Sequence, residues 1–502
     1  MRSTPNGEDA GPAARVQVAI VGSGFAGLGM AIRLKRAHID DFVILERAAD
    51  LGGTWRDNSY PGCACDVESH LYSFSFALNP DWSRRFAPQP EIQAYLERCA
   101  RRFGIIPHIR FDHEVTGARW DDVAQEWIVD TTRGTVRASS LVLGNGPLSD
   151  PVIPDLPGLA AFEGIAFHSS AWRHDVPLDG RDVAVIGTGA SAIQFVPHIQ
   201  RRVGQLHLFQ RTAPWVIPRH DRAVGAGWRR VYRAAPLVQR LARALIYVRH
   251  ELFLVLFRHP RWMKRAEDVA RRGLRKWIRD PDRRARMTPN YTMGCKRLLL
   301  SDDYLPAVAE PNVTVVTAAL REVRRHGVVD ADGIEHRADV IIFGTGFRPT
   351  DPLLAPCIHG RDGRTLADAW QGSPKAYLGT MVAGFPNLFI LLGPNTGLGH
   401  SSVVFMIEAQ VAQVMLVLGE LRRRRAAAIE PSATAQAGFV ADVERRMRGT
   451  VWVAGHCNSW YLDRTGRNSS LWPDFTWRFR RRLLRLVRGD YVSAPPAAPD
   501  AR

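Results

Sequence analysis

Two glycine-rich motifs in this 502-residue chain have the spacing that binds the pyrophosphate of a dinucleotide. The first places Gly22, Gly24 and Gly27 after the apolar run 15–21, and the second places Gly187, Gly189 and Ala192 after the run 182–186. Glycines there let the backbone turn tightly and approach a phosphate at the start of a helix. We expect one dinucleotide at each motif, the second contacting Gly187, Thr188, Gly189, Ala190 and Ser191. The alternative is two tight turns without a ligand.

The residue that follows the next strand distinguishes the two dinucleotides. Glu46 lies 19 residues after Gly27, where a carboxylate accepts a hydrogen bond from a ribose 2′-hydroxyl. The second unit has Arg211 and Thr212 at that place, and a cation there favours a 2′-phosphate. The residues therefore predict FAD and NADPH in one chain, with NADPH reducing FAD.

Several longer motifs occur in a fixed order along the chain. Residues 162–172 read F-x-G-x-x-x-H-x-x-x-W, containing His168, and residues 52–66 read G-G-x-W-x-x-x-x-Y-P-G-x-x-x-D. Shorter matches occupy 294–297, 343–347 and 458–463. From about residue 15 to 480, the chain resembles the class B flavoprotein monooxygenases, and specifically the Baeyer–Villiger monooxygenases. Arg173 departs from the Pro or Asp that usually continues the first motif.

The resemblance implies a reaction and a set of site residues. NADPH reduces FAD, O2 forms a C4a-peroxyflavin, and this peroxide attacks an apolar ketone to give an ester or lactone. Arg297 is the expected cation beside the peroxide, oriented by Asp66. Lys296 and Arg211 are expected to bind the NADP 2′-phosphate. Thr54, Trp55 and Asp66 are expected on the FAD side and Trp460 on the NADP side.

Each of these residues has a simpler interpretation. Arg297 and Asp66 are ordinary surface charges in that interpretation, and Trp55 and Trp460 are core residues. For His168, we weigh a structural role between the domains equally with a catalytic role. Cys63 and Cys65 suggest a disulfide reductase, but C-x-C is not the usual redox spacing, so we expect them only to pack. The nearest alternative enzyme is a flavin-containing N- or S-oxygenase.

The net charge of +17 comes mainly from one segment. Residues 219–290 hold 20 Lys and Arg against 6 Asp and Glu. Three interpretations fit this segment. It forms a solvated helical face, it is the helical insertion that shapes substrate access in the resembled family, or it makes peripheral membrane contact. Nucleic-acid binding is disfavoured because no recognition motif accompanies the charge. A basic nucleic-acid- or membrane-binding protein with a vestigial nucleotide fold would carry no flavin.

The six cysteines are too few for a disulfide scaffold in a chain of this length, and no zinc or other metal spacing is present. The longest candidate membrane stretch, 244–257, contains Arg249, His250 and Glu251, so we expect no transmembrane segment. With no signal peptide at the start, we expect a cytoplasmic, reducing location. The oligomeric state is left open.

These motifs require an α/β fold with two Rossmann-like dinucleotide-binding domains and an inserted helical subdomain. We expect the FAD-binding domain to comprise 1–147 and 351–502, the latter including the C-terminal region. The NADP-binding domain is expected to comprise 148–217 and 293–350. Residues 218–292 are expected to form the basic helical insertion.

Overall fold

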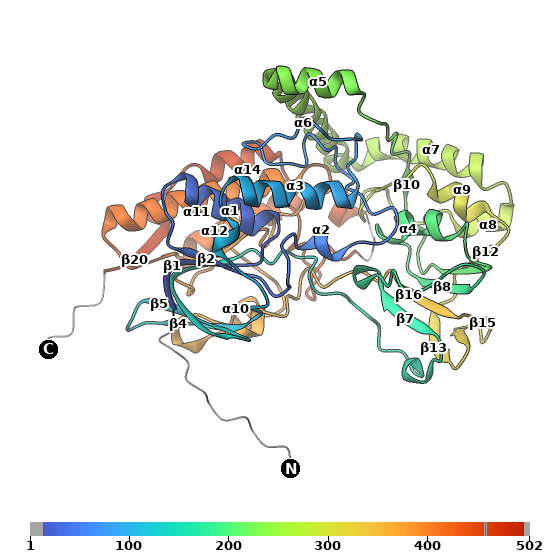
Figure 1. Cartoon of the computed structure of the whole chain (residues 1–502), viewed down its shortest axis with the longest axis horizontal. Coiled ribbons are helices and arrows are strands. Elements are labelled where there is room, and N and C mark those ends of the chain that lie inside the picture. Colours follow the sequence, from blue (N-terminus) through green and yellow to red (C-terminus); the bar gives the residue numbers. More distant parts are fainter. Residues whose placement is uncertain (1–13, 456, 458, 496–502) are drawn as a thin grey trace, which may run out of the picture.

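The first glycine motif directly follows an interior strand of a large mixed sheet. The computed structural model describes residues 14–455, 457 and 459–495, and Figure 1 shows this sheet beside a second one. Its strand order is β17-β4-β5-β6-β1-β2-β3, with β18 also paired to β6. β1 is parallel to both β2 and β6, so their carboxyl ends meet at one edge. The strands are β1 (Ala14–Val21), β2 (Phe42–Leu45), β3 (Ile109–Arg110), β4 (Val115–Asp121), β5 (Glu126–Thr131), β6 (Gly134–Leu143), β17 (Ile358–His359) and β18 (Leu388–Ile390).

The second glycine motif directly follows the middle strand of a separate parallel sheet, whose order is β12-β9-β8-β16-β7. Its central strands are buried and apolar apart from Asp182 at the start of β8, as expected for strands covered on both faces. The strands are β7 (Ile165–His168), β8 (Asp182–Ile186), β9 (Gln205–Phe209), β12 (Val313–Val316) and β16 (Val340–Phe343). Smaller sheets pair β10 (Val216–Ile217) with β11 (Leu299–Leu300), and β13 (Leu320–Arg324) with β14 (Gly327–Asp330) and β15 (Glu335–Arg337).

The basic segment is helical, and its α5 and α6 lie at the top of Figure 1. It contains α5 (Ala226–Ala234), α6 (Pro236–Arg258), α7 (Pro260–Trp277) and α8 (Pro281–Arg286). Prolines at the first positions of α6, α7 and α8 set the breaks between these helices, because proline starts a helix but cannot continue one. The expected fold class, two Rossmann-like units with a helical insertion, is therefore confirmed.

The remaining helices cover the two sheets. They are α1 (Phe25–Arg36), α2 (Thr54–Asp57), α3 (Gln89–Arg102), α4 (Ala192–Ile199), α9 (Tyr304–Ala309), α10 (Leu366–Trp370), α11 (Val403–Arg424), α12 (Ala433–Met447), α13 (Val451–Ala454) and α14 (Thr476–Leu483). Strands β19 (Ala428–Pro431) and β20 (Tyr491–Ala494) form a C-terminal pair. Every strand of the second sheet lies between residues 165 and 343, and β17 and β18 return to the first sheet afterwards. The five domain boundaries stay a prediction.

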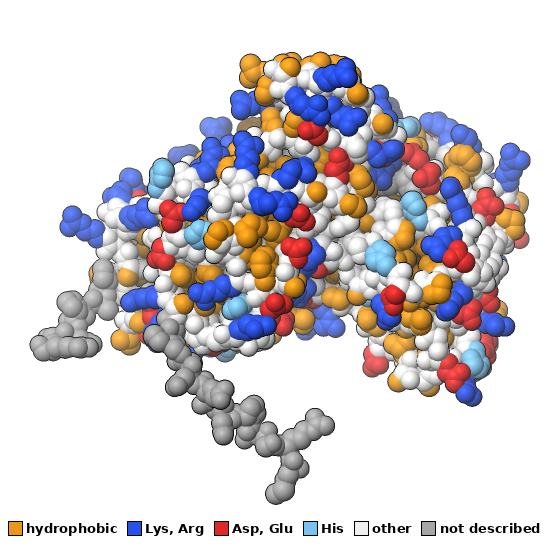
Figure 2. Space-filling model, in the orientation of Figure 1, with side chains coloured by type: hydrophobic (Ala, Val, Ile, Leu, Met, Phe, Trp, Pro, Cys, Tyr) orange, Lys and Arg blue, Asp and Glu red, His pale blue; other side chains and the backbone are white. Residues whose placement is uncertain are grey.

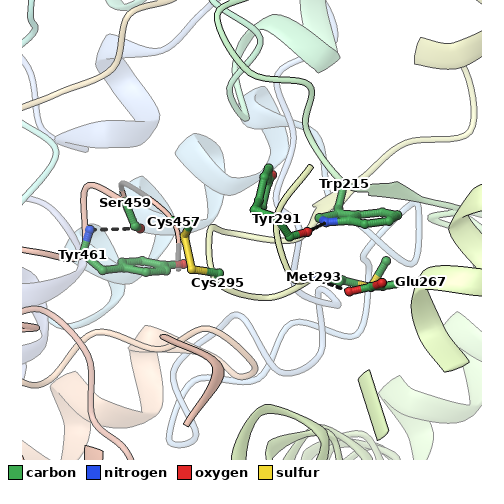
Figure 3. Close-up of a disulfide and its surroundings, with 8 residues drawn as sticks. All are labelled: Trp215, Glu267, Tyr291, Met293, Cys295, Cys457, Ser459 and Tyr461. Atoms are coloured by element: carbon green, nitrogen blue, oxygen red, sulfur yellow. Dashed lines mark hydrogen bonds between the residues drawn. A yellow bond between two sulfur atoms is a disulfide. The ribbon is translucent and has the colours of Figure 1, made fainter. Parts of the chain in front are cut away.

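The sequence did not indicate that any two of the cysteines form a disulfide. Cys295 and Cys457 do so, which a reducing location would not favour. The partners are 162 residues apart, so spacing alone did not reveal the pair. Figure 3 shows the bridge beside the ring of Tyr461, in a cluster that also contains Met293 and Trp215. Cys63 and Cys65 are buried free thiols.

The longest apolar helix is α11 and not the segment 244–257. Among the described residues, α11 alone is long and apolar enough to cross a membrane. However, 61% of its most apolar window is buried inside the molecule, against α1 and α14 among other elements. This burial is what a core helix shows.

Candidate active site

The two sheets meet at a cavity of about 940 Å³. The loops after the carboxyl ends of β6, β8 and β16 reach it, which is where open α/β sheets bind ligands. Thirteen of the residues predicted from the sequence line it: Thr54, Trp55, Asp66, Gly187, Thr188, Gly189, Ala190, Ser191, Arg211, Thr212, Lys296, Arg297 and Trp460. The lining does not include Gly22, Gly24, Gly27 or Glu46.

The first glycine loop has the shape of a phosphate cradle. Gly22 adopts φ +89°, and a Cβ on Gly27 would lie 1.9 Å from the carbonyl oxygen of Gly22, so neither position accepts a side chain. A Cβ on Gly24, in contrast, would meet no atom closer than 3.8 Å. Gly24 is the N-cap of α1 and has no side chain to cap the helix. The free N–H groups of α1 can therefore receive an anion.

The second glycine loop repeats this arrangement. Gly187 adopts φ +107° against Gly344, while a Cβ on Gly189 would have only one neighbour, at 4.0 Å. Ser191 is the N-cap of α4, but its side chain makes no capping hydrogen bond. The side chain of Ser191 therefore does not cap the helix, and the start of α4 is left open to a phosphate in the cavity.

Glu46 follows β2 as expected but points into the protein. Its carboxylate accepts hydrogen bonds from the Ser23 backbone N–H at 2.9 Å, the Ser23 hydroxyl at 2.6 Å and Arg56 at 2.9 Å. Burial opposes ionisation, but these donors outweigh it and lower the pKa of Glu46. A buried anion is thus held directly beside the first glycine loop.

Arg297 and Asp66 come together although 231 residues separate them. Arg297 Nε and Nη2 lie 2.8 and 2.5 Å from the same oxygen, Oδ2 of Asp66. Its third nitrogen, Nη1, has only a long contact of 3.4 Å to the carbonyl oxygen of Leu398. The Asp66 carboxylate raises the pKa of Arg297, so the guanidinium is permanently charged.

Tyr461 lies next to this pair and was not predicted as a site residue. Burial raises the pKa of its phenol to about 12, against an opposing effect of the Arg297 charge. Its hydroxyl is buried and forms no hydrogen bond with a described residue. The sequence did contain a pattern that could have indicated Tyr461, because this residue follows Trp460 within the 458–463 motif. Asn458 of that motif lies outside the described residues.

Lys296 and Arg211 form a paired positive site in the same cavity. Burial and the charge of Arg211 both lower the pKa of Lys296, whose ammonium lies 4.9 Å from the Tyr291 ring centroid. Neither cation forms a salt bridge with any described residue. Two neighbouring cations without a carboxylate fit a phosphate group.

The two tryptophans differ in exposure. Trp55 is buried and donates a hydrogen bond from its indole nitrogen to the Tyr72 hydroxyl at 3.1 Å. Trp460 is 44% exposed and stacks obliquely on Tyr461. The core interpretation therefore fits Trp55 better than Trp460, although both line the cavity.

The 162–172 motif lies at a structural junction. His168 ends β7, is buried, and accepts a hydrogen bond from the Ser170 backbone N–H at 3.2 Å. Its ring meets Phe347 edge-on, and burial lowers its pKa. Arg173 is exposed and pairs with Asp175 at 2.6 Å, away from the cavity.

The side chain of Gln194 connects the Asp66 loop to the second nucleotide-binding unit by hydrogen bonds. Gln194 on α4 accepts from the Tyr60 hydroxyl at 3.0 Å and donates to the Ala64 carbonyl at 2.9 Å. A Cβ on Gly62 would lie 2.3 Å from the His198 ring of α4. The Tyr-Pro-Gly stretch is thus a packing surface between the two units. Nothing in its spacing pointed to Gln194.

Other cavity residues also lack a sequence signal. The hydroxyls of Ser401 and Ser470 are buried, line the cavity, and have no hydrogen-bond partner among the described residues. Orphaned buried hydroxyls are costly unless a ligand or water satisfies them. Together with the two open helix starts, they fit the binding of polar cofactors.

Comparison with known proteins decides the family. The chain is 51% identical over 486 residues to a Baeyer–Villiger monooxygenase of Streptomyces coelicolor, covering 96% of this chain and 93% of the relative. It is 50% identical over 467 residues to one of Pseudomonas aeruginosa, covering 92% and 89%. The chain belongs to the Baeyer–Villiger monooxygenases. A family model described as pyridine nucleotide-disulphide oxidoreductase matches residues 19–224.

Solved structures of other monooxygenases share the fold of this Baeyer–Villiger monooxygenase. An oxidised steroid monooxygenase bound to NADP has a TM-score of 0.86 and 31% identity, with 96% of this chain and 100% of that chain covered. A complex with FAD and NADP has a TM-score of 0.85 and 26% identity, covering 95% and 99%. The expected oxidoreductase class and the cofactors FAD and NADPH are confirmed.

Proposed function

We propose that this Baeyer–Villiger monooxygenase oxidises an apolar ketone to an ester or lactone, using NADPH and O2. The observation that carries the proposal is Arg297, a permanent cation held by Asp66 in the cavity between the two dinucleotide cradles. When bound, FAD supplies the hydride acceptor and the oxygen-transfer chemistry. The lining includes Leu143, Leu148, Leu398 and Leu471, which suits an apolar substrate.

Arg297 stabilises the negative charge that builds up on oxygen during attack on the carbonyl. Both of its Asp66 hydrogen bonds use Nε and Nη2, so Nη1 is the group available to the reacting oxygen. A donor fixed before the reaction needs no reorganisation as the charge develops. Asp66 acts through Arg297 by holding its orientation.

The remaining predicted residues hold the cofactors. The open starts of α1 and α4 receive the two pyrophosphates, and Glu46 orients the FAD side through Ser23. Lys296 and Arg211 bind the 2′-phosphate that distinguishes NADPH from NADH. Trp460 closes the cavity on the nicotinamide side.

A ketone and a thioether assayed with the same preparation test the proposal. A ketone needs a negatively charged oxygen nucleophile, whereas a thioether is oxidised by a neutral one, so only the ketone reaction depends on Arg297. Ester formed from the ketone, and lost in Arg297→Ala, supports the proposal. Thioether oxidation without ester would favour the N- or S-oxygenase.

The domain boundaries and the location of the protein are also proposals. We retain the five-segment domain division, because the strands of the second sheet are nested within those of the first. A cytoplasmic location stays a prediction that fits the use of NADPH. The type of ketone and the oligomeric state are not assigned.

A further inference from the structure

Helix α6 presents a long apolar stripe to solvent. Leu237, Leu241, Leu245, Val248 and Leu252 are between 53% and 73% exposed. At 100° per residue these five positions fall within an arc of about 80°. They therefore form one continuous apolar stripe, here called the outer stripe, along most of the helix.

The buried positions of α6 combine apolar packing, by Leu254 and Phe257, with polar contacts. Gln239 donates to the carbonyl of Asn79 at 2.6 Å, and the Arg243 guanidinium donates to the carbonyl of His70 at 2.7 Å. Glu251 accepts from the Thr476 backbone N–H at 2.9 Å and hydroxyl at 2.7 Å. An ordinary surface helix presents charged and polar residues to solvent, whereas α6 presents the apolar stripe there.

A second set of contacts fixes α6 to the active-site loop. His250 lies 2.5 Å from the carboxylate of Glu68, two residues after Asp66, and Arg249 pairs with the same carboxylate. The other ring nitrogen of His250 lies 2.5 Å from the carbonyl of His400. The outer stripe is therefore a permanent feature of the surface and not a core face exposed by displacement.

The charges around the outer stripe have one sign. Residues 226–258 contain seven arginines and a single carboxylate, Glu251, which is buried. Arg240 and Arg249 flank the stripe on its two sides, about 40–60° from its edges. Arg230 and Arg240 are exposed and form no salt bridge with a described residue. Figure 2 shows hydrophobic and basic side chains intermixed over α5 at the top of the molecule.

The rest of the insertion adds to this surface. Trp228 and Val231 on α5 are exposed, as is Phe253 on α6. Twelve of the 25 large hydrophobic side chains exposed among the described residues lie in 226–277, about a tenth of the chain. Such a concentration exceeds what scattered surface residues explain and marks an interaction site.

We propose that α5 and α6 dock the enzyme on an anionic lipid bilayer. The outer stripe would enter the boundary between head groups and acyl chains, with the helix parallel to the surface, while the arginines contact lipid phosphates. Trp228 suits that boundary because its ring is amphipathic. A second copy of the chain fits less well, because a two-fold interface would bring the arginine rows of both copies together.

Vesicle co-sedimentation of the full-length holoenzyme tests this. One set of vesicles is phosphatidylcholine alone and the other contains about one third phosphatidylglycerol. We expect binding to the anionic vesicles at least about tenfold tighter than to the neutral ones. Hydrogen exchange should slow over 226–258 when anionic vesicles are present.

Two variants separate the apolar and electrostatic contributions. Leu241→Ser/Leu245→Ser/Leu252→Ser and Arg230→Gln/Arg240→Gln should each weaken anionic-vesicle binding by about tenfold or more. The matched controls are Ile334→Ser/Leu353→Ser and Arg33→Gln/Arg201→Gln, which change exposed residues elsewhere and should bind normally. NADPH oxidation by the leucine and arginine variants should equal wild type, which shows that they fold.

Three outcomes would overturn the proposal. The first is wild-type protein that binds neither kind of vesicle. The second is a leucine variant that binds anionic vesicles as wild type does, because the outer stripe would then not enter the lipid. The third is a leucine variant that changes the mass of the particle in lipid-free solution, which would identify the stripe as a contact between copies of this chain.

Discussion

Both hydrogen bonds from Arg297 to Asp66 end on the same carboxylate oxygen, Oδ2. A bidentate pair would use both oxygens and would engage the guanidinium along one full edge. Here Nη1 faces Leu398 across 3.4 Å and is the donor with most freedom to meet another oxygen. The pair is therefore arranged to orient a cation and not to neutralise it.

Removing the cation should stop oxygen transfer and leave flavin reduction intact. For Arg297→Ala we expect ester formation to fall by about 10²–10³-fold, the usual effect of losing one fixed donor to a developing oxyanion. Anaerobic reduction of the flavin by NADPH should change little, and the oxygen consumed should appear as hydrogen peroxide. Arg173→Ala, which removes an exposed arginine paired with Asp175, is the matched control. Unchanged ester formation in Arg297→Ala would remove this residue from the mechanism.

Asp66 should matter through orientation. Asp66→Asn keeps the shape of the side chain but removes the charge that holds Arg297, so we expect about tenfold less ester and more peroxide per NADPH. Asp66→Glu, which keeps the charge, should recover part of the coupling. A purely structural residue would instead lower the thermal midpoint without altering the ratio of ester to peroxide.

The cation pair should select NADPH over NADH. Arg211→Ala and Lys296→Ala should each raise the Kd for NADPH by about 10–100-fold, the worth of one charge-assisted hydrogen bond, with little change for NADH. Arg201→Ala, an exposed arginine in the same unit, is the control. Equal losses for both nucleotides would mean that neither cation contacts the 2′-phosphate.

The disulfide should stabilise the region around Lys296 and Arg297. Cys295 directly precedes those residues, and Cys457 lies three residues before Trp460. We expect Cys457→Ser to destabilise this region by about 2–5 kcal/mol and to lower the thermal midpoint. Dithiothreitol should lower the midpoint of wild type but not of Cys457→Ser, while Cys357→Ser, at a free cysteine, should behave as wild type. Two free thiols at 295 and 457 in non-reduced protein would contradict the bridge.

Attachment of the insertion should weaken in mild acid because of His70. Burial, and secondarily the charge of Arg243, lower the pKa of His70 to about 4. Its imidazole accepts a hydrogen bond from Gln239 at 3.1 Å and packs against Tyr232 of α5. An unfolded histidine binds its proton near pH 6.5, so the stability contributed by neutral His70 is lost as pH falls from 6.5 towards 4.

Hydrogen exchange measures this loss directly. Between pH 7 and pH 5, opening of α5 and α6, corrected for intrinsic rates, should increase by roughly twentyfold from this one group. His70→Gln, which does not titrate, should show a much smaller increase. The same increase in both proteins would assign the pH dependence to other groups.

The parts of the site that short motifs encode were predictable from the sequence. Glycines that need a positive φ or a close approach, such as Gly22 and Gly187, have no substitute, so their spacing is informative. Arg297 and Asp66 were found because each lies inside a motif. Ser191 lines the cavity, but its side chain does not cap α4.

Contacts across large sequence separations were missed for a physical reason. The Gln194 bonds to Tyr60 and Ala64 span 134 and 130 residues, and the disulfide spans 162. No local pattern specifies such pairs, since only the folded chain brings them together. Helical periodicity likewise shows that α6 carries an apolar stripe, but it does not say that the stripe faces outwards.

The return of β18 to the first sheet has a consequence for synthesis of the chain. Leu388 of β18 pairs with Leu141 of β6, so the two partners are made 247 residues apart. At 5–20 residues per second, the carboxyl end of β6 waits roughly 10–50 s on the ribosome for its neighbour. During that interval the nested second sheet is completed, while the first sheet exposes an unpaired strand edge. Nascent chains of this enzyme should therefore depend on chaperones during that window.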